Sequence, residues 1–144
     1  MKTILLSILL LSGCGGGDPV APVVVAFYGD SITEGRTMDI AQGAFQVQDF
    51  AKAAKTSDSP LDAHDISTIT VLRYGMADAF KHIPPEVTRW NLVLRIAQIA
   101  ALGRRPEVVN VNHTESGIEK PTNAAIADLV TIDVSDVGGA TVDG

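Results

Sequence analysis

The sequence has 144 residues, enough for one domain with a sizeable core but too few for two ordinary domains. Hydrophobic residues make up 46% of the chain and charged residues 19%, which is a globular rather than a disordered composition. The formal net charge is −6, and the lysines and arginines are scattered apart from the pair Arg104-Arg105. A basic patch that could neutralise phosphates is therefore not expected, and we predict no nucleic-acid partner.

The N-terminal segment is predicted to direct export. Lys2 precedes a short apolar run, residues 4–11, which is too short for an ordinary transmembrane helix. Residues 1–13 are therefore predicted to be a signal peptide. The single cysteine of the chain follows in Leu-Ser-Gly-Cys, which resembles a bacterial lipobox and implies a lipid on Cys14. A plain secretory signal with an incidental cysteine is the alternative.

A glycine-rich tether is predicted between the anchor and the domain. Residues 14–22 include three consecutive glycines, and such a stretch is flexible and solvated. Glycine rather than aspartate directly after Cys14 resembles the outer-membrane sorting pattern. We therefore expect a lipid-anchored protein of the bacterial cell envelope, at the outer membrane if the host has two membranes.

Residues 23–144 are predicted to alternate between strands and helices. A β-branched apolar run predicts a buried strand at 23–28, and similar runs predict strands at 66–74, 107–111 and 130–134. Helical patterns are predicted at 44–55, from the prolines at 84 and 85 onward, and at 122–129, with a polar loop at 56–65. In the middle helix Trp90, Leu94, Ala97 and Ala101 recur at helical spacing and form one apolar stripe.

This alternation predicts an α/β fold. We expect a three-layer α/β/α sandwich with a parallel, flavodoxin-like sheet and helices on both faces. In such sheets the active crevice lies at the carboxyl ends of the strands. Gly29, Asp30 and Ser31 follow the first strand directly, so they lie where this architecture places its chemistry. The same residue types also form ordinary turns and helix caps.

Three sequence blocks resemble the SGNH (GDSL-type) hydrolases. The first is Gly-Asp-Ser-Ile-Thr-Glu-Gly after the first strand, residues 29–35. The second is residues 69–80, which resemble the strand and Gly-x-Asn-Asp of the family's third block. The third is residues 132–144, which resemble the approach to its last block, Asp-x-x-His. The blocks occur in the family's order over nearly the whole of 23–144.

The resemblance implies a serine esterase that needs no metal and no organic cofactor. Ser31 would be the nucleophile, activated by a histidine that a carboxylate, matching Asp143, orients. The oxyanion would be stabilised by donors of the active-site loops, for which the matching residues are Gly43, Gly75 and Asp78. A small-molecule or carbohydrate ester would be the substrate. Gly43 is the best candidate for a second block that is otherwise unclear.

Two departures from the family pattern favour an inactive chain. Ala77 stands where the family has its oxyanion asparagine, and the catalytic histidine belongs three residues after Asp143, past Gly144. We therefore expect the domain to be incomplete at its C-terminus, cut before its base. A natural end with loss of catalysis is the competing interpretation.

The three histidines within the chain are weaker candidates for the base. His64 lies in the polar loop, His82 follows the third-block loop, and His113 follows the third predicted strand with Glu115 and Ser116 nearby. A structural role is the preferred interpretation for each, and none pairs with another at metal-ligand spacing.

Two functions remain open from the sequence. The first is an esterase that hydrolyses acetyl or short acyl esters, including esters carried by carbohydrate, through an acyl-serine intermediate. The second is a non-catalytic envelope lipoprotein that keeps the fold as a carbohydrate-binding or interaction module. Ala77 and the position of the missing histidine favour the second function, whereas the three ordered blocks favour the first.

Overall fold

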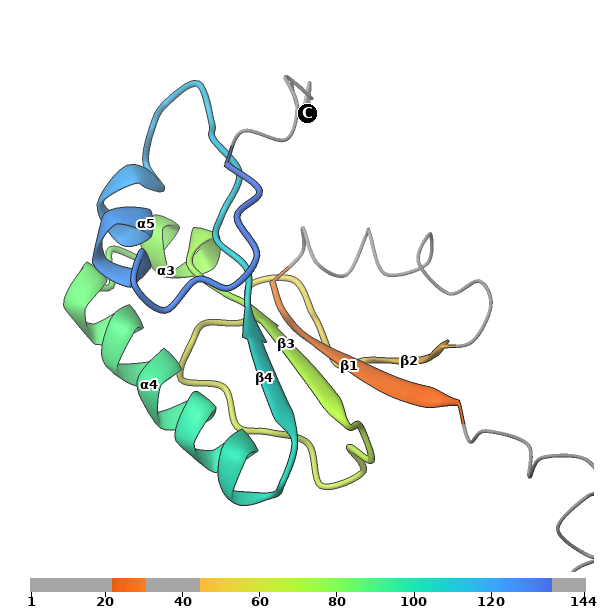
Figure 1. The fold of residues 1–144 in the computed structure, drawn as a ribbon. Helices are drawn as coiled ribbons and strands as arrows, with labels where there is room; N and C mark the ends of the chain where they lie inside the picture. Colours follow the sequence, from red (N-terminus) through yellow and green to blue (C-terminus); the bar gives the residue numbers. More distant parts are fainter. Residues whose placement is uncertain (1–21, 31–44, 136–144) are drawn as a thin grey trace, which may run out of the picture.

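The computed structural model describes residues 22–30 and 45–135 of the chain. These residues contain four strands and three helices, in the order β1-β2-β3-α3-α4-β4-α5 (Figure 1). The strands are β1 (Val23–Gly29), β2 (Phe45–Asp49), β3 (Ile69–Arg73) and β4 (Arg105–Val108). The helices are α3 (Met76–Phe80), α4 (Pro85–Ala101) and α5 (Lys120–Ile126).

The four strands form one parallel sheet in the order β2-β1-β3-β4. Val25 of β1 pairs with Val47 of β2 on one side and with Ile69 of β3 on the other. Beyond β4, Val109 forms a parallel bridge with Ile132, which continues the order of a flavodoxin-like sheet. The predicted α/β class and parallel sheet are confirmed.

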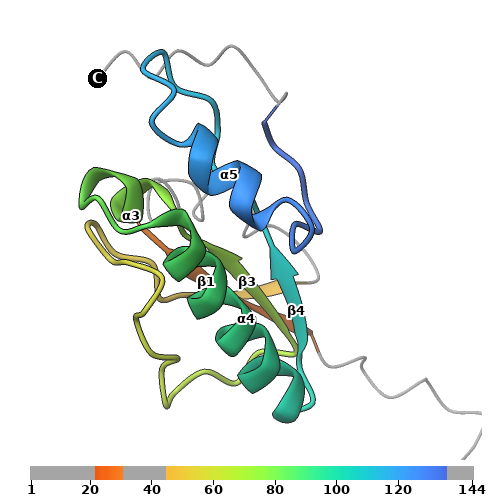
Figure 2. The ribbon, with the colours of Figure 1, turned by 90° about the vertical axis from the view of Figure 1, so that its left-hand side faces the viewer.

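The described helices cover one face of the sheet. Figure 2 shows α4 and α5 in front of the strands, and α4 packs against both α5 and β4. The part of the chain that the structure describes places no helix on the opposite face.

Strand β1 runs through the core, as its apolar run predicts. Ala26 and Tyr28 are fully buried, and the ring of Tyr28 stacks on Phe50 with centroids 5.1 Å apart. The buried Tyr28 hydroxyl donates a hydrogen bond to Asp65 Oδ2 (2.8 Å) and accepts one from the backbone N–H of Asp62 (3.0 Å). Burial raises the pKa of this hydroxyl. The polar loop 56–65 is thereby tied to the first strand.

The helix predicted at residues 44–55 is wrong, because this segment begins with strand β2. Val47 lies between two glutamines, and this alternation suits a strand at the end of a sheet better than a helix. The alanines that follow suggested a helix, yet the chain turns there. The backbone N–H of Ala51 bonds Asp49 Oδ1 (2.9 Å), and Ala54 takes a positive φ of 63°.

The apolar stripe predicted for the middle helix lies on its exposed side. Trp90 is 63% exposed and Leu94 is 45% exposed, whereas Thr88, Leu92 and Ile99 are buried. Apolar residues lie on more than half of the surface of α4, so two different apolar stripes have helical spacing. Periodicity alone does not tell which of the two stripes is buried.

The remaining predicted elements are present with shorter or shifted bounds. The predicted strand at 66–74 is β3, the one at 107–111 is β4, and the helix at 122–129 is α5. The strand predicted at 130–134 is reduced to the single bridge at Ile132.

We predict that the buried carboxylate of Asp78 is required for stability. It accepts hydrogen bonds from Ser57 Oγ (2.5 Å), Ser57 N (3.1 Å) and Thr88 Oγ1 (3.0 Å), so α3 is joined to both the 56–65 loop and α4. Asp78→Ala leaves these buried donors without an acceptor and should lower the free energy of unfolding by about 2–4 kcal/mol in urea denaturation. The exposed Asp58→Ala is the matched control, and an equal loss in both variants would contradict the prediction.

Candidate active site

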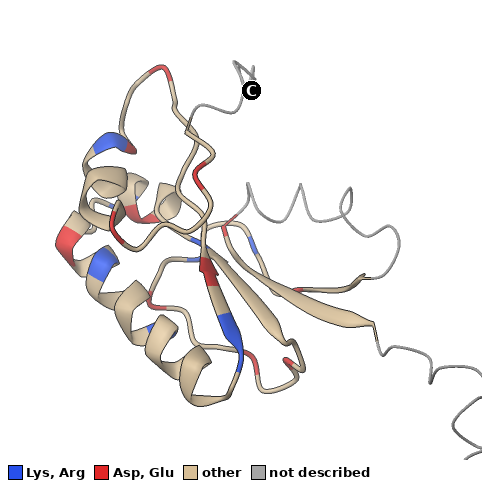
Figure 3. Cartoon of the chain, viewed as in Figure 1, with Lys and Arg blue, Asp and Glu red and all other residues tan. Residues whose placement is uncertain are grey.

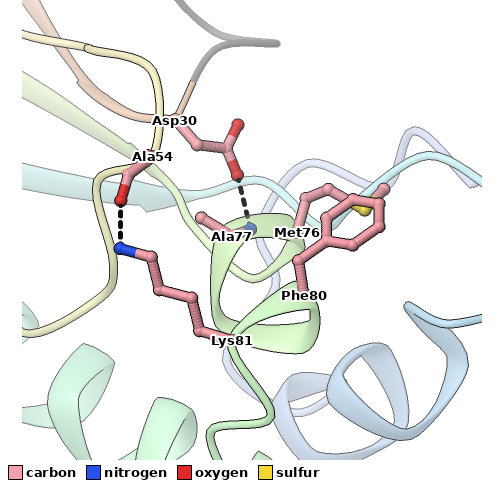
Figure 4. Close-up of a pocket in the computed structure, with 6 residues that line it drawn as sticks. All are labelled: Asp30, Ala54, Met76, Ala77, Phe80 and Lys81. Carbon is pink, nitrogen blue, oxygen red and sulfur yellow. Dashed lines mark hydrogen bonds between the residues drawn. The ribbon is translucent and has the colours of Figure 1, made fainter.

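The carboxyl end of β1 and the start of α3 meet at Asp30. Asp30 directly follows β1 and is buried, with 4% of its surface exposed. Its Oδ2 accepts a hydrogen bond from the backbone N–H of Ala77 (3.3 Å), as Figure 4 shows. The first and third sequence blocks, 47 residues apart, are thereby joined by a carboxylate and a backbone amide.

Gly75 allows the third block to approach α5 and the segment that follows β4. Its φ is 137°, a conformation that side chains other than glycine rarely adopt. A Cβ atom here would lie 2.9 Å from Val111 Cγ2 and 3.0 Å from Thr122 Cγ2. Glycine is therefore required for both backbone and packing reasons, which supports the residue type that the sequence singled out at this position.

A pocket opens beside Asp30, with a volume of about 240 Å³. It is lined by Asp30, Ala54, Met76, Ala77, Phe80 and Lys81. The ammonium group of Lys81 donates a hydrogen bond to the backbone oxygen of Ala54 (2.7 Å), which ties α3 to the loop after β2. Ala77 stands where the family pattern has an oxyanion asparagine. It contributes only a small apolar side chain to the wall of the pocket.

Asp78, which the sequence places in the active-site loop, is not among the residues that line the pocket. Its side chain is fully buried and accepts hydrogen bonds from Ser57 and Thr88. The side chain therefore joins α3 to the 56–65 loop and to α4.

His113 forms a pair with a buried carboxylate. Its Nδ1 lies 3.2 Å from Glu119 Oε1; the Glu119 side chain is fully buried, whereas that of His113 is 54% exposed. Glu119 also accepts hydrogen bonds from Thr114 N (3.0 Å) and Thr114 Oγ1 (2.6 Å). A carboxylate on Nδ1 fixes the ring and leaves Nε2 as the other polar atom, which is the arrangement of a general base.

The segment that carries His113 is linked to the end of β1. Gly29 is the register partner of Arg73 on β3, and the guanidinium group of Arg73 donates a hydrogen bond to Asn112 Oδ1. Asn112 directly precedes His113, and Gly29 is two residues before Ser31. Both segments therefore leave the same carboxyl edge of the sheet.

Among the described residues, neither of the other two histidines has a buried carboxylate as its partner. The side chain of His64 is 92% exposed, and its partner Asp62 is itself exposed at the surface. His82 is exposed and has a φ of 57° at the end of α3. Sequence reasoning placed Glu115 and Ser116 beside His113, but the partner is Glu119, six residues away. Neither spacing nor periodicity in the sequence indicates this pair.

Four residues predicted for the site or the anchor lie outside the described residues. They are Cys14, Ser31, Gly43 and Asp143. Their roles stay predictions.

Within residues 22–30 and 45–135, histidine, cysteine, aspartate and glutamate side chains form no group of three suited to a metal ion. Across the same ranges, each helix lacks the length or apolarity needed to cross a bilayer. Figure 3 shows the lysines and arginines of the described residues dispersed over α4, β4, α5 and the loops.

The sequence matches no protein-family model and no curated protein. Solved structures do match. Esterase EstA from Pseudoalteromonas sp. is 16% identical, with a TM-score of 0.60 over 74% of this chain and 70% of that one. A member of the lipolytic protein G-D-S-L family from Veillonella parvula is 14% identical, with a TM-score of 0.59 over the same shares. A GDSL-like lipase from Bacteroides thetaiotaomicron is 15% identical, with a TM-score of 0.59 over 85% and 70%.

The fold and the site therefore define a parallel α/β protein with its candidate site at the carboxyl edge of the sheet. More narrowly, the fold is that of the GDSL-type (SGNH) hydrolases, as the three sequence blocks predict.

Glu119 is predicted to make stability depend on acid pH. Burial raises the pKa of its carboxyl, but hydrogen bonds from Thr114 and His113 outweigh burial and hold the pKa at about 2. Because the folded pKa is depressed, the stabilisation is complete above the ordinary glutamate pKa of about 4.3 and is lost as the pH falls toward 2. Glu119→Gln should lower the melting temperature at pH 7 and flatten its decline below pH 4.3.

The exposed Glu115→Gln is the matched control for this titration. Differential scanning calorimetry from pH 7 to pH 2.5 measures both variants and the parent protein. Parallel curves for Glu119→Gln and the parent would contradict a role for the Glu119 carboxylate.

Proposed function

We propose that this chain is an SGNH-type serine esterase that hydrolyses acetyl or short acyl esters, including esters carried by carbohydrate. The observation that carries the proposal is the meeting of Asp30 and Ala77 at the carboxyl edge of a sheet with the GDSL-hydrolase fold. This is the edge at which parallel α/β proteins bind their substrates. Ser31, the proposed nucleophile, follows Asp30 directly in the sequence.

Ser31 acts as the nucleophile in this proposal. Its Oγ attacks the ester carbonyl, a base removes the hydroxyl proton, and the same base returns it to the leaving alcohol. Water then attacks the acyl-serine while the base takes its proton. The base returns this proton to Ser31 Oγ, which releases the acid and the free serine. Backbone N–H groups at the ends of β1 and β3 stabilise the oxyanion.

His113, oriented by Glu119, is the base that we propose within this sequence. Three observations support it: the 3.2 Å contact to a buried carboxylate, the exposed ring, and the link from Gly29 through Arg73 to Asn112. The resemblance instead assigns the base to a position three residues after Asp143. The sequence alone favoured an inactive chain, and the Glu119–His113 pair is the reason for the change.

The proposed location is the bacterial cell envelope, with a lipid on Cys14 and residues 14–22 as the tether. The support is the sequence pattern around Cys14.

Ala77 favours a second candidate function, a non-catalytic carbohydrate-binding or interaction module. An alanine supplies no side-chain donor for an oxyanion, and loss of one such donor costs about a hundred- to a thousandfold in rate. The two functions differ in whether Ser31 turns over an ester.

Hydrolysis of p-nitrophenyl acetate and butyrate by the 144-residue chain tests the esterase proposal. Ser31→Ala should abolish turnover. His113→Gln should lower kcat at least about a thousandfold, whereas His64→Gln should leave kcat unchanged. Full activity of His113→Gln would overturn the choice of base, and activity that survives Ser31→Ala would overturn the esterase mechanism.

Ala77→Asn should raise the rate, because it restores a donor at the position where the family pattern has one. We expect kcat/KM to rise at least about tenfold. Ala77→Leu, which has a similar size but no donor, is the matched control and should give no gain. An equal change in both variants would show that space, not hydrogen bonding, controls the rate at this position.

A further inference from the structure

A stripe of apolar side chains runs along the exposed side of α4. Val87, Trp90 and Leu94 are 42%, 63% and 45% exposed, and two exposed alanines, Ala97 and Ala101, continue the stripe. These five residues, called the outer stripe below, are separated by three and four residues in turn. This is the a/d spacing of a helix that packs lengthwise against another helix. Figure 2 shows α4 in front of the strands, so the side of α4 away from the sheet is open to a partner.

The arginines of α4 are held against the chain's own loops and not over the outer stripe. The guanidinium group of Arg89 donates a hydrogen bond to Asp128 Oδ2 (3.0 Å). Arg95 donates to the backbone oxygens of Asp58 (2.6 Å) and Ser59 (2.9 Å). A second copy of α4 laid on the stripe therefore meets no repulsion between these cations.

The two ends of α4 carry opposite charges. Glu86 lies in the first turn and is exposed. Arg104 and Arg105 follow the C-terminal end, and the side chain of Arg105 stays 73% exposed although its Nε pairs with Glu107. An antiparallel pair brings each Glu86 to the arginine end of the other copy, whereas a parallel pair brings the two Glu86 side chains together. The helix dipoles favour the antiparallel direction as well.

The sizes of the side chains favour the same direction. The large residues Val87 and Trp90 lie in the N-terminal half of the outer stripe, and the small Ala97 and Ala101 lie in the C-terminal half. Leu94 is at the centre, seven residues from either end. An antiparallel pair centred on Leu94 sets large residues against small ones, which fills the space evenly. A parallel pair would set tryptophan against tryptophan and leave a gap between the alanines.

We propose that the outer stripe is the interface of a homodimer, in which two copies of α4 pack antiparallel about a two-fold axis at Leu94. An isologous two-fold pair is the commonest form of soluble oligomer. The helix has 17 residues, so the contact is about 25 Å long. This proposal does not depend on the esterase function.

The area of the outer stripe suits a weak dimer. A tryptophan side chain carries about 150–250 Å² of surface, and most of that surface is exposed in Trp90. With the rest of the stripe, the two copies together would bury on the order of 1,000 Å², which is the lower limit for a specific interface. We therefore expect a dissociation constant of about 1–100 µM.

Sedimentation equilibrium of the 144-residue chain from 1 to 200 µM, with tryptophan fluorescence at the same concentrations, is the first test. Trp90 is the only tryptophan of the chain, so its emission reports directly on the stripe. We expect monomers to convert to dimers as the concentration rises, with a blue shift of the emission over the same range. A monomer at every concentration would overturn the proposal.

Leu94→Glu should weaken the dimer at least about a hundredfold, because it sets two like charges against each other at the two-fold axis. Leu94→Lys should do the same, and an equal mixture of the two variants should associate again. Ile66→Glu, a change at an apolar residue that is 68% exposed and outside α4, is the matched control and should leave the dimer intact. A dimer that survives Leu94→Glu, or a mixture that stays monomeric, would overturn the proposed interface.

Disulfide cross-linking tests the direction of packing, in a Cys14→Ser background that removes the native thiol. Leu94→Cys should cross-link to itself under mild oxidation. Val87→Cys should not, because the two copies of residue 87 lie at opposite ends of the contact, but it should cross-link to Ala101→Cys. Self-cross-linking of Val87→Cys without that of the mixed pair would overturn the antiparallel arrangement.

Other occupants of the outer stripe give different results. A monomer whose Trp90 emission is blue-shifted at every concentration would mean that another segment of the same chain covers the stripe. A monomer whose emission shifts only with vesicles of phosphatidylethanolamine and phosphatidylglycerol would assign the stripe to a lipid surface. Either result would overturn the homodimer.

Discussion

The close approach of Gly75 to Val111 and Thr122 is the constraint on which the candidate site depends. It brings the end of β3 against the segment that continues from β4 and against α5, and it sets where α3 begins. Asp30 then reaches the backbone of Ala77 from β1. The segments that follow β1, β3 and β4 are thereby held together at one edge of the sheet. Each of them has a polar group there.

The sequence predicted the fold well where one residue pattern had one structural interpretation. The β-branched run of β1 and the prolines before α4 are such cases. Prediction failed where two patterns overlapped. The alanines after Phe50 suggested a helix across a segment that begins as the strand β2, and α4 carries two apolar stripes of which tertiary packing buries the one with Leu92.

Only those residues of the candidate site that belong to a local sequence motif could be predicted. Gly75 and Asp30 were found because turns and strand ends have strong local signals. The pairing of His113 with Glu119 had none, because it depends on how the segment before α5 folds back on itself. Asp30 and Ala77 are 47 residues apart, so sequence periodicity does not predict their contact either. The contacts of the candidate site are long-range or irregular, whereas the secondary structure depends on local sequence patterns.

The central claim is that Ser31 is an activated nucleophile at the carboxyl edge of the sheet. The most direct measurement is mass spectrometry of the protein after reaction with an alkyl fluorophosphonate, which bonds covalently to activated serines. We expect a single adduct on the peptide that contains Ser31, and no adduct in Ser31→Ala. An unmodified Ser31 peptide after prolonged reaction of the folded protein would contradict the claim and favour the non-catalytic module.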